Sequence, residues 1–236
     1  MSAQTRQYRK PDNSYWLETL KPLHCLLFVL PLLVFFHLGT HQTGLLAEHW
    51  LRKILSHFGG TAACLPPLAI VSVLLGQHVF KRDRWEIHPR VLGGMCVESV
   101  LWIIPLIAVS HITALIFFAA TTQPSSLDQL RVGIGAGIYE EFIFHLLAIG
   151  LIMAIFIDGM SAPKVPTAIF AVVATAILFS LSHLNVPPFY ASEPFSAHAF
   201  VSRIAAGSYL GAIFILRGFG VAVGAHVMWN IYVYVM

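Results

Sequence analysis

About seven long apolar stretches constrain the fold of this chain more than any other feature. Each holds roughly 20 residues, the length that an α-helix needs to cross the hydrocarbon core of a membrane. Hydrophobic residues make up 57% of the 236 residues and charged residues only 11%, whereas soluble domains carry roughly 25% charged residues. A surface so poor in charge needs lipid around it, because water would drive the chain to aggregate. The sequence therefore predicts an all-α, polytopic membrane helix bundle of about seven transmembrane helices, or roughly six to eight.

The apolar stretches divide the chain into a polar tail, residues 1–21, and a single transmembrane domain, residues 22–236. The predicted spans are 22–40, 61–80, 92–120, 132–157, 165–184, about 200–216 and 219–236. Residues 44–58 place apolar side chains at helical spacing between charged ones, which favours a helix that lies in the membrane interface. The pair Pro66 and Pro67 is predicted to kink the second span, and residues 121–131 are predicted to form a loop.

The positive charges cluster in the N-terminal tail and in the 81–90 loop. With seven spans both segments lie on one side of the membrane, which the positive-inside rule assigns to the cytoplasm. Arg52, Lys53 and Arg131 oppose this assignment, and insertion of residues 44–58 would invert everything after them. We expect an integral, multi-pass protein of the bacterial plasma membrane that is surrounded by membrane lipids.

Other partners and covalent links are not indicated by the composition. The net charge is only +3 and no long basic run is present, so no nucleic-acid partner is expected. The three cysteines lie far apart and form no C-x-x-C pair, which predicts neither a disulfide framework nor a zinc ribbon.

Small residues recur four positions apart in the second half of the chain. The pairs are Gly133/Gly137, Gly207/Gly211 and Gly220/Gly224. In lipid such spacing lets two helix backbones approach closely, so we expect the fourth, sixth and seventh spans to pack in one bundle.

Ionisable side chains inside the predicted spans are the strongest indication of function, because they are costly at bilayer depth and usually face a cavity or a partner. In the second half of the chain these positions, with one amide, are Glu140, Glu141, His145, His183, His226 and Asn230. Glu141 and His145 share one helix face, whereas Glu140 points about 100° away from Glu141. The fourth and fifth spans are antiparallel, so Glu140 and His183 are expected at a similar depth. Three helices can therefore converge on one polar pocket.

Other polar residues in the spans have a simpler interpretation. We expect each of His24, His37, His78 and His111 to hydrogen-bond a neighbouring carbonyl group. Glu98 either bonds a neighbouring helix or forms part of the wall of the same pocket. The set of Glu140, His183, His226 and Asn230 differs, because one acid, two imidazoles and an amide are what is needed to activate a water and stabilise an oxyanion.

Three motifs in this half of the chain resemble those of the CAAX protease and bacteriocin-processing (CPBP) family, which is related to the type II CAAX prenyl endopeptidases. Where that family has Glu-Glu-x-x-x-Arg, Phe-x-x-x-His and His-x-x-x-Asn, the chain reads Glu140-Glu141-Phe-Ile-Phe-His145, Phe179-Ser-Leu-Ser-His183 and His226-Val-Met-Trp-Asn230. Order and spacing agree, and the match covers about residues 130–236, the predicted catalytic core. His145 departs from the pattern, because it stands where the family has an arginine that pairs with the second glutamate.

The resemblance implies a membrane-embedded endopeptidase that acts on membrane-associated or prenylated, CAAX-type peptides and lipidated proteins. It implies that Glu140 and His183 polarise a water, and that His226 and Asn230 donate hydrogen bonds to the oxyanion. Glu141, His145 and Phe179 would support these groups.

Two alternatives to this mechanism stay open. No cofactor is expected, since the resemblance points to a metal-free glutamate mechanism. Two histidines and a carboxylate nevertheless match the ligand set of hydrolytic zinc sites, although the H-E-x-x-H helix is missing. The non-enzymatic alternative is a transporter, or a catalytically degenerate scaffold, binding or immunity-type protein of the same fold.

Overall fold

A computed structural model of the chain describes residues 14–38, 46–56, 64–117, 127–186, 191 and 193–235. Within these ranges the chain forms helices and no β-strand, apart from one isolated bridge between Leu184 and Glu193. The predicted all-α membrane helix bundle is confirmed. Of the predicted tail and loop, residues 1–13 and 121–126 lie outside the described residues.

The helices follow the predicted spans closely. In chain order they are α1 (Tyr15–Glu18), α2 (Pro22–His37), α3 (Leu46–Ser56), α4 (Leu65–Lys81), α5 (Pro89–Leu101), α6 (Ile103–Phe117), α7 (Leu127–Glu140), η1 (Glu141–Ile149), α8 (Gly150–Met153), η2 (Ala154–Gly159), α9 (Lys164–Ser182), α10 (Ala197–Arg217) and α11 (Phe219–Val235). Among the described residues, four stretches are long and apolar enough to cross a membrane: Pro89–Ile112, Leu130–Gly159, Lys164–Ser182 and Ala197–Arg217. The helices α2, α4 and α11 are apolar but shorter.

Proline chemistry explains two differences from the predicted spans. Pro66 and Pro67 lie in the first turn of α4, where a missing N–H costs no helical hydrogen bond, so the kink predicted there is wrong. The predicted third span is instead interrupted at Trp102, between α5 and α6. Pro105 has no N–H to donate to the carbonyl of Leu101, and its ring crowds that turn of the helix. A further difference is that α7 begins at Leu127, inside the predicted 121–131 loop.

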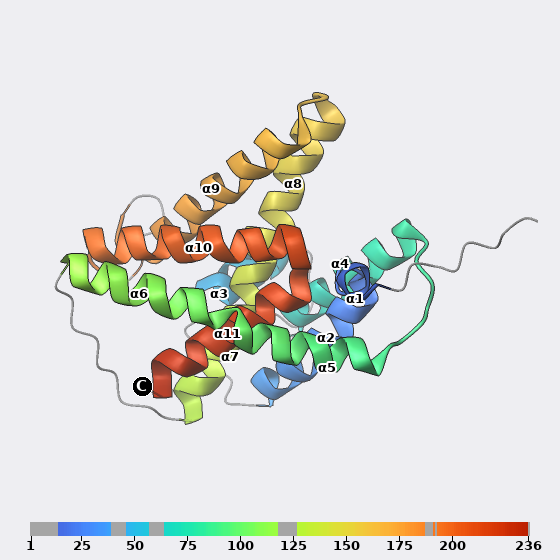
Figure 1. The fold of residues 1–236 in the computed structure, drawn as a ribbon, viewed down its shortest axis with the longest axis horizontal. Coiled ribbons are helices and arrows are strands. Elements are labelled where there is room, and N and C mark those ends of the chain that lie inside the picture. The colour runs from blue at the N-terminus through green and yellow to red at the C-terminus, as the bar shows by residue number, and fades with distance from the viewer. Residues whose placement is uncertain are drawn as a thin grey trace, which may run out of the picture.

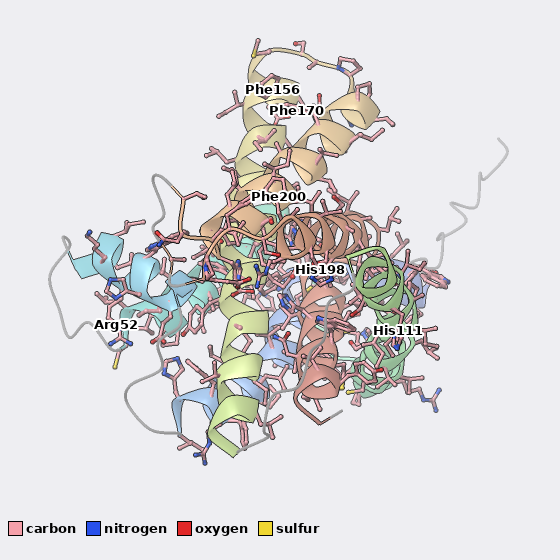
Figure 2. The ribbon with its side chains drawn as sticks, turned by 90° about the vertical axis from the view of Figure 1, so that its left-hand side faces the viewer. Arg52, His111, Phe156, Phe170, His198 and Phe200 are labelled. Carbon is pink, nitrogen blue, oxygen red and sulfur yellow. The ribbon has the colours of Figure 1, made fainter. Side chains whose placement is uncertain are left out.

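The helix α11 is the centre of the bundle. Residues 219–227 are all buried, and α11 packs against α2, α5, α7 and α10. Figure 1 shows α8 and α9 as a hairpin that rises from the rest of the bundle. At that hairpin the rings of Phe156 and Phe170 lie 5.7 Å apart (Figure 2). A helix that is apolar on all sides, as α11 is, suits this central position.

Glycines allow the closest helix contacts around α11 and α10. A Cβ atom at Gly137 would lie 2.7 Å from Cγ2 and 3.1 Å from the backbone nitrogen of Val227. A Cβ atom at Gly207 would lie 3.1 Å from the Phe179 ring and 3.3 Å from Ala176. The α7–α11 and α9–α10 contacts therefore depend on these two glycines. Both contacts lie beside predicted site residues, because Val227 follows His226 and Phe179 is itself one of them.

Glu98 bonds neighbouring helices, which is the first of its two predicted roles. The buried Arg217, at the end of α10, contacts both Glu98 carboxylate oxygens, at 2.5 Å from Nε and 3.0 Å from Nη2. Tyr15 and Trp102 also donate to Glu98, at 2.6 and 3.0 Å. Burial, and then the adjacent carboxylate, raises the pKa of Tyr15, so the phenol keeps the proton that it donates. This cluster attaches α1 to α5 and α10.

The single histidines behave differently from one another. His111 bonds the Ile107 carbonyl, as predicted, and lies on the outer side of α6 (Figure 2). His37 instead contacts the Tyr139 hydroxyl at 2.7 Å. His24 accepts from a backbone N–H at 3.2 Å, and the buried ring nitrogens of His78 have no hydrogen-bond partner within the described part of the chain. The carbonyl prediction is therefore wrong for these three.

We predict that Gly137→Ala destabilises the protein by about 1–3 kcal/mol, because the added methyl group overpacks the contact between α7 and α11. The matched control is Gly150→Ala, on the continuation of the same helix, where a Cβ atom meets nothing within 4 Å. That change should be neutral or stabilise the helix by up to about 1 kcal/mol. Unfolding in detergent micelles measures both variants, and equal stability of the two would contradict the close approach.

Candidate active site

The candidate site begins where α7 changes its hydrogen-bonding pattern. Glu140 is the last residue of α7, and Glu141 is the first residue of the π-helical stretch η1, in which each N–H bonds the carbonyl five residues earlier. Such wider turns are rare and are frequent at functional sites. The transition places two consecutive glutamates in the core of the bundle, with Glu141 buried and Glu140 partly so.

Glu140 faces His183, which ends α9. The Oε1 atom of Glu140 lies 3.3 Å from Nε2 of His183. The other ring nitrogen, Nδ1, lies 2.9 Å from the Phe179 carbonyl oxygen, one turn earlier in α9. A carbonyl oxygen can only accept, so Nδ1 carries the hydrogen and Nε2 is the nitrogen that faces the carboxylate. The expected similar depth of Glu140 and His183 is thus what the structure has.

Glu141 lies between two imidazoles. Its Oε2 atom is 2.5 Å from Nδ1 of His145 in the next turn, and its Oε1 atom is 2.8 Å from Nδ1 of His226 in α11. The three side chains are all but fully buried. The second ring nitrogen of His226, Nε2, lies 3.7 Å from Oε2 of Glu140. His226 therefore stands between the two consecutive carboxylates, with one ring nitrogen towards each.

The hydrogens needed for these contacts can be counted. Four of the contacts are within hydrogen-bond distance: His145 with Glu141, His226 with Glu141, and the contacts of His183 with the Phe179 carbonyl and with Glu140. Each needs one hydrogen between its two heavy atoms, since an ionised carboxylate only accepts. Three neutral imidazoles supply three hydrogens. The direct contact between His183 and Glu140 accordingly requires one further proton, carried by either group, which makes this the pair suited to move a proton.

The hydrogen bond of Asn230 goes to the backbone of α7 and not to another residue of the predicted site. Its Nδ2 atom donates to the carbonyl oxygen of Gly133 in α7, at 2.8 Å. That bond ties α11 to α7 one turn from His226. Of the two amide hydrogens of Asn230, one is used by this bond and one is left for another acceptor.

Aromatic rings close the apolar side of the site. The Phe179 ring centroid lies 4.8 Å from that of His183 and 6.2 Å from that of His226, and it meets both rings edge-on. The Phe144 ring centroid lies 5.5 Å from that of Phe179. Packing of this kind fixes the ring planes of both imidazoles. Of the seven residues predicted for the site, these contacts join six, and the seventh, Asn230, donates its hydrogen bond to a backbone carbonyl of α7.

Some contacts of the site carry no signal in the sequence. The hydroxyl of Ser182 lies 3.2 Å from Nδ1 of His183, and the carbonyl of Gly133 receives the Asn230 amide. Neither residue belongs to a spacing that predicts such a contact. The bond from Glu141 to His226 crosses 85 residues of chain and was likewise not indicated by the motifs, which pair Glu141 only with His145.

The fold and the buried acid–imidazole cluster define the chain as an integral membrane protein with a polar site inside its helix bundle. Residues 121–232 match the family model described as "Type II CAAX prenyl endopeptidase Rce1-like". The match contains all three motifs, so the resemblance to this family that they predicted is confirmed. The family is one of proteases. Neither the curated proteins nor the solved structures contain a match to the chain.

We predict that Glu141→Gln destabilises the protein by about 1–3 kcal/mol, the cost of a buried polar group left without its partner. A glutamine offers one acceptor oxygen, so one of the two imidazole N–H groups would face an NH2 group. Glu193→Gln is the control, because Glu193 is partly exposed and is bonded by Arg203 near the surface. Unfolding midpoints in detergent compare the variants. A Glu141→Gln protein as stable as the wild type would show that Glu141 does not accept from both imidazoles.

Proposed function

We propose that the protein is an intramembrane endopeptidase that hydrolyses peptide bonds of membrane-associated or prenylated, CAAX-type peptides. The observation that carries the proposal is the position of the Glu140 carboxylate, which has His183 on one side and His226 on the other. A carboxylate between two imidazoles, in a bundle of a protease family, has the groups that water-mediated hydrolysis needs. We further propose a multi-pass topology in a bacterial plasma membrane, as the apolar composition suggests.

The first step would be activation of a water by Glu140 and His183. With a hydrogen on Nδ1, a neutral His183 offers a lone pair on Nε2, so a water can donate one hydrogen to it and one to Glu140. The water oxygen then attacks the scissile carbonyl carbon, its proton passes to Glu140, and the π electrons move to the carbonyl oxygen. Glu140 returns the proton to the amide nitrogen as the C–N bond breaks. The products are a carboxylic acid and an amine.

His226 is the proposed donor to the oxyanion. Its Nδ1 is engaged by Glu141, and its Nε2 lies 3.7 Å from Glu140, too far for a strong hydrogen bond. Donation from Nε2 while Nδ1 also donates requires an imidazolium, which the adjacent Glu141 carboxylate stabilises. The second amide hydrogen of Asn230 is the further donor in this proposal. One such donor is worth roughly 3–4 kcal/mol in other hydrolases.

Glu141, His145 and Phe179 would then be positioning residues. Glu141 holds the Nδ1 side of His226, and His145 holds Glu141 from the next turn of the helix. Phe179 contacts both imidazole rings. In this arrangement His145 takes the place of the arginine of the family and donates to Glu141 as an arginine would.

Glu140→Gln tests the proposal, because an amide cannot accept the proton of the attacking water. We expect cleavage of a prenylated CAAX peptide by the purified protein to fall by about 10²–10⁴-fold, the usual contribution of a general base. Glu86→Gln, at an exposed carboxylate, should cleave at the wild-type rate. Normal cleavage by a folded Glu140→Gln protein would rule out the mechanism. Absence of cleavage by the wild type, over a panel of prenylated and leader-type peptides, would favour the scaffold alternative.

A zinc-dependent variant of the same hydrolysis has one observation in its favour. His183 and His226 each turn their second ring nitrogen to a carbonyl or a carboxylate, as zinc-bound imidazoles do. The spacing of the side chains counts against it. Among the described residues, ligand atoms that all lie within 4.8 Å of one another occur in a different acid–imidazole group and not in Glu140, His183 and His226. The residues thus fit a metal less well than a water.

Chelation separates the two variants. We expect the cleavage rate to stay within twofold after removal of metals with a strong chelator, because the proposed base and oxyanion donors are side chains. The control is the same treatment followed by addition of Zn2+. Loss of cleavage by chelated protein that stays folded, with recovery on Zn2+ addition, would replace the metal-free mechanism by the zinc-dependent one.

A further inference from the structure

A second group of acid and imidazole side chains lies away from the candidate active site, where α1, α2 and α5 meet. Glu18 is the last residue of α1, His24 lies in the first turn of α2, and His88 is the residue that precedes α5. The Oε2 atom of Glu18 is 3.4 Å from Nδ1 of His24 and 3.7 Å from Nδ1 of His88. One possible ligand atom from each of the three residues lies within 4.8 Å of the other two.

Each of these three converging atoms is buried and has no hydrogen-bond partner among the residues that the structure describes: Oε2 of Glu18, Nδ1 of His24 and Nδ1 of His88. The side chains of Glu18 and His24 are all but fully buried, at 3% and 0% exposure. Buried polar atoms are almost always hydrogen-bonded, so three orphans that face one point need an explanation. A bound cation supplies it, because all three atoms have a lone pair to offer once His24 carries its hydrogen on Nε2.

The distances fit a small tetrahedral ion. Zinc binds imidazole nitrogen and carboxylate oxygen at about 2.0–2.1 Å, which separates neighbouring ligand atoms by about 3.3 Å. The two measured separations from Glu18, 3.4 and 3.7 Å, lie close to this value. Two imidazoles and one carboxylate are also a zinc ligand set found in proteins.

Two of the ligands have a hydrogen bond to a neighbouring group before an ion binds. Lys21 bonds the other carboxylate oxygen of Glu18, Oε1, at 2.5 Å and so leaves Oε2 free for a ligand. Nε2 of His24 accepts from the backbone N–H of His88 at 3.2 Å. An imidazole that binds a metal through Nδ1 carries its hydrogen on Nε2, so this one bond must open when the ion binds. Three orphaned atoms gain a partner in exchange for one long hydrogen bond.

We propose that Glu18, His24 and His88 form a zinc site that ties the N-terminal segment to the start of α5. The site is separate from Glu140 and its imidazoles and does not depend on the proposed protease activity. Glu18 and His24 belong to two consecutive helices, and His88, at the start of α5, lies 64 residues beyond His24. Bound zinc therefore cross-links α1, α2 and α5 and raises the stability of the folded bundle.

Zinc titration of the full-length, metal-stripped protein in detergent tests this site. We expect one Zn2+ per chain at the group, with affinity at least tenfold weaker in His24→Ala and in His88→Ala. The His88 side chain makes no capping bond for α5 and is partly exposed, so His88→Ala is the variant least at risk of misfolding. His111→Ala, on the outer side of α6, is the matched histidine control and should bind as the wild type does.

The active-site variant Glu140→Gln distinguishes zinc binding at this group from zinc binding at the candidate active site. It should still bind zinc at wild-type affinity, with the zinc-induced rise in unfolding temperature lost only in the Glu18, His24 and His88 variants. Bound Co2+ should give the visible absorption of a tetrahedral site. Failure to bind zinc at micromolar concentrations would overturn the proposal. So would zinc binding that Glu140→Gln abolishes and His88→Ala leaves unchanged.

Discussion

The buried bond between Glu141 and His226 is the interaction on which the geometry of the site depends. It joins the π-helical turn of η1 to the central helix α11, and together with Phe179 it sets the plane of the His226 ring. His145 holds the other oxygen of the same carboxylate. A charge buried this deeply is tolerated only when it is paired and hydrogen-bonded. Since two imidazoles meet that requirement at Glu141, Glu140 is left with contacts that are longer and easier to open.

Close helix packing is what makes these contacts possible. Gly137 lets α7 approach α11 at Val227, the residue next to His226, and Gly207 lets α10 approach α9 beside Phe179. The Glu98–Arg217 pair joins α5 to α10 and brings Tyr15 and Trp102 into the same cluster. In lipid, where apolar burial gives little drive for helix association, small residues and interhelical hydrogen bonds supply the specificity. Close packing of the helices therefore brings the polar side chains of the site together.

Much of the bundle could be predicted from the sequence, because apolar length and the cost of intramembrane charge act on short segments. The i, i+4 relation placed Glu141 beside His145, and the antiparallel order of two spans placed Glu140 beside His183. Contacts between distant segments could not be predicted in this way. The bond from Asn230 to the Gly133 carbonyl, and the position of His226 between both glutamates, depend on how α11 is rotated against α7. The pairing of Arg217 with Glu98 could not be predicted either, because an arginine at the end of a span is equally typical of the membrane boundary.

The central claim is that a water held at Glu140 attacks a peptide bond inside the bundle. Cleavage of a prenylated CAAX peptide by the purified wild-type protein in H2¹⁸O, followed by mass spectrometry of the products, tests it most directly. The account predicts one ¹⁸O atom in the newly formed carboxylate, because the attacking oxygen comes from solvent and no other step of the proposed mechanism exchanges it. An intact peptide after prolonged incubation with folded protein, or a product that carries no ¹⁸O, would contradict it.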